Sequence, residues 1–144
     1  MENKNFGFES CSHKFTNGFT VVNTTPHPLT FLDGEEVVVV ENNPSVLVNA
    51  RAVEERVNSS IVQTKFYPDG PGKEIVRDLI GTFREEWENQ TLKIVGSVIA
   101  ANAYPEVVGM CPAPGFERKP PQEKRMSCEK FNSGDIYPDF WKEG

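Results

Sequence analysis

The first half of the chain carries short runs of β-branched and apolar residues separated by turn signals, which is the pattern of β-strands. Asp33-Gly34 lies between two of these runs and is a strong signal for a tight hairpin. The pattern therefore predicts an antiparallel meander, with a further strand after it. Residues 52–57, with Val53 and Val57 at i, i+4 spacing, are interpreted as a helical turn or a loop. The strands are expected at residues 19–25, 29–32, 37–40, 46–50 and 61–67.

Residues 73–89 have the clearest helical pattern in the chain. Apolar side chains recur at i, i+3 and i+4 spacing, and charged side chains occupy the opposite face. Gly81 is the one weak position, because glycine costs roughly 1 kcal/mol relative to alanine inside a helix. The apolar positions are Ile75, Val76, Leu79, Ile80, Phe83 and Trp87.

The stretch from Leu92 to Arg118 predicts a strand, a short helix, a second strand and a rigid loop. Ser97 is a suitable N-cap, and Pro105 ends the helix because proline disfavours a helical residue before it. Helix-start amides, a side-chain amide, an aromatic ring and a cation near one another often build an anion or nucleotide site. An ordinary core unit with a proline-rich exit fits the same pattern. The elements are expected at residues 92–95, 98–104 and 107–108, followed by a stiff turn at 112–115.

The length of 144 residues is enough for one domain with a single core. We expect an α+β fold in which an antiparallel sheet packs against one long helix and one short helix, assembled as an oligomer. Residues 1–18 are polar with three phenylalanines and are expected to form an N-terminal arm rather than core. Residues 132–144 form an aromatic C-terminal tail, and arm and tail are expected to pack on the body or on a neighbouring subunit. The ligand-binding domain is expected at 19–131.

Composition excludes several classes of function. The net charge is −6 and no basic tract occurs in the first hundred residues, which argues against nucleic-acid binding. No apolar run approaches the length of a membrane span. Because the chain begins Met-Glu-Asn-Lys-Asn, without an apolar signal region, we expect it in the cytoplasm.

The cysteines and histidines do not predict a metal site. The three cysteines are odd in number and form no CxxC pair, and neither His13 nor His27 has a cysteine nearby. We therefore expect no metal and no cofactor.

Catalysis is not expected either. The chain has no nucleophile-elbow sequence, and His27 is flanked by prolines. Cys111 has no obvious histidine partner. The segment 70–73, Gly-Pro-Gly-Lys before a helix, lacks the spacing and the Lys-Ser/Thr pair of a phosphate loop, so a turn into a helix is the simpler interpretation.

Some polar and aromatic residues are candidates for ligand binding, each with a structural alternative. Asn102 lies in a helix otherwise fit for burial, so its amide either caps structure or binds a ligand. Arg118 follows a rigid loop and suits two-point phosphate contact, although a solvated surface loop is the alternative. Thr25 and His27 lie at a strand end, where a turn motif is the alternative. Further candidates, with core packing or solvent exposure as alternatives, are Phe83, Trp87 and Arg125.

Five segments carry a resemblance to a known family. Residues 22–31, Val-Asn-Thr-Thr-Pro-His-Pro-Leu-Thr-Phe, are similar to the NxTPH opening of a group of small phage and prophage proteins. Ile94–Pro105 and Pro114–Arg118 continue the likeness, as do Glu123–Met126 and Lys130-Phe131. Over residues 19–131 the chain resembles the first type of Thoeris anti-defence protein.

The resemblance implies a protein that sequesters a signalling nucleotide. Members of that family bind cyclic ADP-ribose isomers made by bacterial TIR-domain enzymes, withhold them from the immune effector and do not cleave them. They form oligomers with pockets at subunit interfaces, and some also capture cyclic nucleotides of a related defence system. The alternatives are a nucleotide-processing enzyme or a phage structural or assembly protein. The expected ligand-binding residues are Asn102, Arg118, Phe83, Trp87, Tyr104, Phe116, Arg125, Thr25 and His27.

Overall fold

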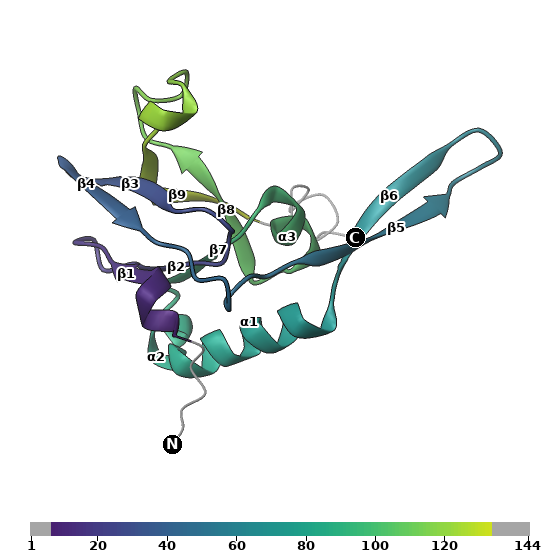
Figure 1. Ribbon diagram of the computed structural model, residues 1–144, viewed down its shortest axis with the longest axis horizontal. Helices are drawn as coiled ribbons and strands as arrows, with labels where there is room; N and C mark the ends of the chain where they lie inside the picture. The colour runs from purple at the N-terminus through teal and green to yellow at the C-terminus, as the bar shows by residue number, and fades with distance from the viewer. Residues whose placement is uncertain (1–6, 134–144) are drawn as a thin grey trace.

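A mixed sheet of seven strands is the framework of the protein (Figure 1). The computed structural model describes residues 7–133. Within the large sheet the strands lie in the order β1-β2-β7-β8-β9-β3-β4, and β5 and β6 form a separate two-stranded sheet. The strands are β1 (Ser12–Lys14), β2 (Thr20–Asn23), β3 (Leu29–Asp33), β4 (Glu36–Val40), β5 (Ala50–Arg56), β6 (Val62–Pro68), β7 (Leu92–Val95), β8 (Val107–Pro112) and β9 (Met126–Ser133).

The α+β class is confirmed, but the expected antiparallel meander is wrong. The β3–β4 hairpin is present, with Gly34 at φ 66° in its turn, as the Asp33-Gly34 signal predicted. Beyond it, β2 pairs in parallel with β7, β7 in parallel with β8, and β3 in parallel with β9. Strands of the first half therefore find partners in the second half. Such crossover pairings depend on how distant segments pack, which the local pattern does not encode.

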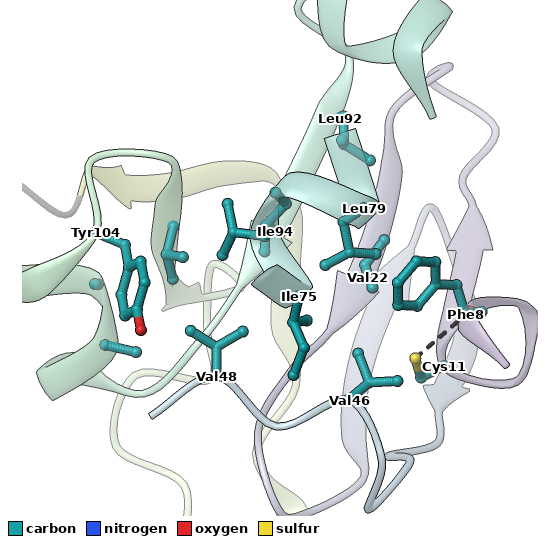
Figure 2. Packing of buried hydrophobic residues seen from close by; sticks show 14 residues of the cluster. Phe8, Cys11, Val22, Val46, Val48, Ile75, Leu79, Leu92, Ile94 and Tyr104 are labelled. Carbon is teal, nitrogen blue, oxygen red and sulfur yellow. Dashed lines mark hydrogen bonds between the residues drawn. The ribbon is translucent and has the colours of Figure 1, made fainter. Parts of the chain in front are cut away.

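The central strands are buried on both faces because successive side chains of a strand point to opposite sides. Val22 and Ile94 face α1 (Gly70–Thr82), whereas Val21 and Val95 face the other way. Figure 2 shows the first cluster, in which residues of the sheet meet α1. The second cluster is formed by Phe15, Val21, Leu29, Phe31, Val40, Val95 and Cys128.

The described part of the N-terminal segment belongs to the body and is not a separate arm. Phe8 is fully buried in the first cluster, close to Cys11 (Figure 2), and Phe15 is 2% exposed in the second. The expectation of an arm outside the core is therefore wrong for residues 7–18, because burial of these rings stabilises a position against the sheet. Of the predicted C-terminal tail, residues 134–144 lie outside the described residues.

Hydrogen bonds join segments next to the two edge strands, β1 and β4. Thr16 donates to Asp33 twice, from its N–H to Oδ2 (3.0 Å) and from its hydroxyl to Oδ1 (2.7 Å). The Asn43 amide donates to the Gly7 carbonyl (3.2 Å) and to the Ser10 hydroxyl (3.1 Å). The two bonds from Thr16 stabilise the ionised carboxylate and lower the pKa of Asp33.

The predicted long helix is two helices. α1 begins at Gly70, earlier than expected, because the Asp69 carboxylate caps it by accepting a hydrogen bond from the Gly72 N–H (2.7 Å). α1 ends at Thr82. Phe83 leaves the helical conformation with φ −109° and ψ 44°, and α2 (Arg84–Glu88) follows. The single helix expected over 73–89 is therefore wrong at its centre.

The short helix α3 (Val98–Ala103) is confirmed. The Ser97 hydroxyl accepts a hydrogen bond from the Ala100 N–H (3.1 Å), as expected of an N-cap. Two 3₁₀ turns complete the fold, η1 (Phe8–Cys11) and η2 (Pro121–Glu123). No helix within residues 7–133 combines the length and the apolar character that crossing a membrane requires.

The β5–β6 hairpin extends away from the rest of the molecule (Figure 1). It corrects two expectations: the strand at 46–50 is absent, and the turn or loop at 52–57 is strand β5. Val46 and Val48 are buried in the first cluster without belonging to a strand. β5 escaped prediction because most of its side chains are exposed and it shows no apolar alternation.

Polar cross-strand contacts support this hairpin. The Tyr67 hydroxyl donates to Glu55 Oε2 (2.9 Å), and Lys65 Nζ lies 3.5 Å from Glu55 Oε1. The Arg51 guanidinium lies over the Tyr67 ring, 5.6 Å from its centroid. These residues share one face of the hairpin, since each lies at an odd-numbered position of the paired strands.

Strand β9 was not predicted from the sequence. It lies between β8 and β3 and joins the two halves of the sheet. Its Phe131 lies opposite Met110 of β8, and its Met126 pairs with Phe31 of β3. The segment before it, residues 119–125, is a basic, proline-rich loop that contains a 3₁₀ turn.

Candidate ligand-binding site

A groove of about 970 Å³ runs along one side of α1. Its other wall is the connection from α3 to β8, formed by Tyr104, Pro105 and Glu106. We call this space the α1 groove. Its volume lies at the upper end of the range typical of small-molecule sites.

Three cations of the α1–α2 segment line the α1 groove. Lys73 and Arg77 are one helical turn apart on α1, Arg84 opens α2 after the break at Phe83, and all three line the groove. The acidic residues in the lining are Asp78 and Glu106. Three cations against two carboxylates leave the groove with a net positive charge in a chain whose net charge is −6. This part of the surface therefore favours an anionic ligand.

Tyr104 fixes one end of the groove. Its hydroxyl donates to the Asn49 carbonyl (2.7 Å) and accepts from the Asp69 N–H (3.1 Å). The side chain is 2% exposed, and burial raises the pKa of its hydroxyl. Tyr104 therefore positions the wall of the groove, and its hydroxyl is already occupied by the protein. The role of Tyr104 in ligand binding stays a prediction, because its side chain also lines the α1 groove.

A second, smaller groove of about 530 Å³ adjoins the first. It is lined by Trp87, Glu88 and Lys93, and it shares Pro105 and Glu106 with the α1 groove. We call it the Trp87 groove. Trp87 also packs against the first core cluster. Trp87 therefore contributes both to the core and to the wall of this groove.

The two strongest sequence candidates do not come together within one chain. Asn102 is exposed on α3, so the expectation that its amide is buried is wrong. Arg118 is exposed on the loop after β8. α3 precedes β8 and the loop follows it, and six residues of strand span about 20 Å. Neither residue lines the α1 groove or the Trp87 groove.

The other loop candidates lie on the same excursion after β8. Phe116 is half-buried, and its N–H donates to the Ala113 carbonyl (2.9 Å), which makes the turn compact. Arg125 donates to the Lys124 carbonyl (3.1 Å). Neither Phe116 nor Arg125 lines either groove.

The Asn-Thr-Thr-Pro-His segment forms a corner between β2 and β3. The fully buried Asn23 amide donates to the His27 carbonyl (2.8 Å) and to the Val40 carbonyl (3.1 Å). The Thr25 N–H (2.9 Å) and hydroxyl (2.7 Å) both donate to Asn23 Oδ1. Thr25 therefore serves the turn motif, which was the structural alternative for it. His27 is exposed beside this corner and lines neither groove.

Phe83 packs against the first core cluster at the break between α1 and α2. It lines neither groove, so the structure supports its core interpretation.

Sequence reasoning missed the residues that give the α1 groove its charge. Lys73, Arg77 and Arg84 lie on what the periodicity identifies as the solvated side of a helix. The i, i+4 spacing of Lys73 and Arg77 is a weak signal by itself. This side of the helix becomes one wall of a groove because the Tyr104–Glu106 connection forms the other wall. That connection begins twenty residues after Arg84 in the chain.

Within residues 7–133 no group of three or more His, Cys, Asp or Glu side chains could hold a metal ion. Comparison with known proteins found no matching family model, curated protein or solved structure.

Proposed function

We propose that the protein binds a cyclic ADP-ribose-type signalling nucleotide in the α1 groove and withholds it, uncleaved, from a bacterial immune effector. The likeness of residues 22–31 and 94–105 to the first type of Thoeris anti-defence protein supports this ligand class. The observation that carries the proposal is the gathering of Lys73, Arg77 and Arg84 along one wall of a groove in an acidic protein.

The chemistry of the groove suits a phosphate-bearing guest. A cyclic ADP-ribose carries two phosphates and a purine. Arginine binds phosphate through two parallel N–H donors, and lysine adds a point charge. Arg84 is paired only loosely, since its Nη1 lies 3.5 Å from Glu88 Oε2 and both side chains are mostly exposed. A phosphate can therefore replace Glu88 at little cost.

Sequestration sets a demand on affinity that favours assembly. To outcompete an effector, the protein must bind at about nanomolar level, or about −12 kcal/mol. The groove lies on the surface of one subunit. A second copy that covers it would exclude water and increase the contact with the ligand. A homo-oligomer in the cytoplasm of the infected cell is therefore part of the proposal.

One experiment separates sequestration from the alternatives. The purified protein is titrated with cyclic ADP-ribose isomers by calorimetry, and the complex is then heat-denatured and the released ligand is analysed. We expect tight binding and quantitative recovery of the intact isomer. Recovery of a cleaved product would identify an enzyme. Absence of heat with every isomer would favour a structural or assembly protein.

A further inference from the structure

The α1 groove and the Trp87 groove adjoin each other. They share Pro105 and Glu106, and α2 contributes to both, with Arg84 in the first and Trp87 and Glu88 in the second. Arg84 and Trp87 are three residues apart, about one helical turn, or roughly 5 Å along a helix axis. A ligand of more than one chemical part can therefore contact both grooves at once.

The two grooves differ in chemistry. The α1 groove gathers Lys73, Arg77 and Arg84, which favours phosphate. In the Trp87 groove the Lys93 ammonium lies over the Phe19 ring, 5.2 Å from its centroid.

The carboxylates that line the Trp87 groove are Glu88 and Glu106. Carboxylates accept hydrogen bonds from sugar hydroxyls and exocyclic amino groups, and an indole ring offers a surface for a base. One end thus suits phosphates and the other suits a nucleoside.

We infer that the two grooves form one composite site for a nucleoside diphosphate unit. Its diphosphate lies on Arg77 and Arg84, its ribose hydroxyls donate to Glu106, and its base stacks on Trp87. When the ligand binds, its phosphate replaces Glu88 as the partner of the Arg84 guanidinium. The Glu88 carboxylate is then available to accept hydrogen bonds from the nucleoside. This inference rests on the proposed function, since a cyclic ADP-ribose contains such a unit, and it adds the direction in which the ligand is bound.

The test uses ADP and inorganic pyrophosphate as probes. The chain has two tryptophans, so a Trp141→Phe background leaves Trp87 as the single indole reporter. Calorimetry first compares this background with the parent protein. We expect ADP to quench Trp87 fluorescence in a saturable way, and pyrophosphate to bind without quenching because it occupies the α1 groove alone.

Two variants on α2 test the two parts of the composite site separately. Trp87→Leu should weaken ADP binding by about 5- to 100-fold, the range of a lost base stack, and leave pyrophosphate binding unchanged. Arg84→Ala should weaken both probes. Because Trp87 also packs against the core, Trp87→Phe serves as the matched variant that keeps an aromatic ring and should retain most of the ADP affinity.

The outcomes separate this inference from the proposed function. The composite site is refuted if ADP does not bind, if it binds without changing Trp87 fluorescence, or if Trp87→Leu weakens ADP and pyrophosphate equally. If ADP behaves as expected but no cyclic isomer binds, the composite site stands and sequestration fails. If a cyclic isomer binds and is recovered intact while Trp87 fluorescence does not change, sequestration stands and the composite site is wrong.

Discussion

At Gly72, helix α1 lies close to Tyr104 of the groove wall. A Cβ at this position would overlap the Tyr104 hydroxyl and lie 2.8 Å from Asp69 Oδ1. Gly72→Ala should therefore destabilise the fold by about 1–3 kcal/mol, the usual cost of overpacking. Gly81→Ala in the same helix has no atom within 4 Å of its new Cβ and should be stabilising by up to roughly 1 kcal/mol. Urea unfolding measures both, and equal stabilities would contradict the close contact with Tyr104.

Asp33 makes stability depend on pH. Its pKa is lowered because Thr16 donates two hydrogen bonds to the ionised carboxylate. A lowered folded-state pKa gives stability that is fully present above the unfolded value of about 3.9. That stability is lost as the pH falls through the folded-state pKa. Asp33→Asn should be less stable than the parent at neutral pH and should lose less stability on acidification. Urea unfolding from pH 7 to pH 2.5 measures the free energy of unfolding of both proteins. An equal loss of stability in the two on acidification would show that other carboxylates dominate.

At the residue scale, the sequence predicts those features that depend on residues close together in the chain. The Ser97 cap depends on Ala100, and Gly34 supplies the positive φ of its own turn. The role of Asn23 depends on the Val40 carbonyl, which lies seventeen residues away in the chain. The exposure of Asn102 likewise depends on what covers α3, and an alanine-rich sequence does not reveal it.

At the scale of elements, periodicity found those with clear apolar positions, found β6 although it is mostly exposed, and missed β5 and β9. α1, β3, β4 and β7 have clear apolar positions and were predicted. β5 is largely exposed and reads as a charged segment. The break at Phe83 leaves the apolar spacing of 73–89 intact, so the pattern continues through an interruption of the backbone. The groove forms between elements, so the sequence pattern of any one element does not predict it.

The proposed site on α1 can be tested against the loop after β8. Arg77→Ala should weaken binding of a cyclic ADP-ribose isomer by about 1.5–3 kcal/mol, the value of a hydrogen bond to a charged group. That is roughly a ten- to hundred-fold rise in Kd. Arg118→Ala, an equally exposed arginine at the far end of β8, is the matched control and should leave Kd unchanged. Calorimetry measures both, and both melting temperatures should stay close to that of the parent. The opposite ranking would move the site to the loop, as the sequence alone had suggested.

At the scale of the whole molecule, the fold is set by pairings between distant strands. β2 and β3 are neighbours in the chain but lie apart in the sheet, with β7, β8 and β9 between them. The mixed sheet places the Tyr104–Glu106 connection beside α1, and this arrangement creates the α1 groove. The α+β class followed from composition and periodicity. The site did not, because it depends on how α1 lies beside the α3–β8 connection, and β7 and α3 separate these two segments in the chain.

The charge distribution of the molecule gives a prediction that depends on salt. A net charge of −6 repels a phosphate-bearing ligand at long range, whereas the cations of the α1 groove attract it at close range. The Debye length falls from about 10 Å at 0.1 M salt to about 3 Å at 1 M. Because the groove is open to solvent, its attraction should be screened, and Kd for a cyclic ADP-ribose isomer should rise over this range. In Arg77→Ala the rise should be smaller, since one screened contact has been removed. Calorimetry at several NaCl concentrations gives both slopes, and an affinity independent of salt would mean that the phosphates do not lie on Lys73, Arg77 and Arg84.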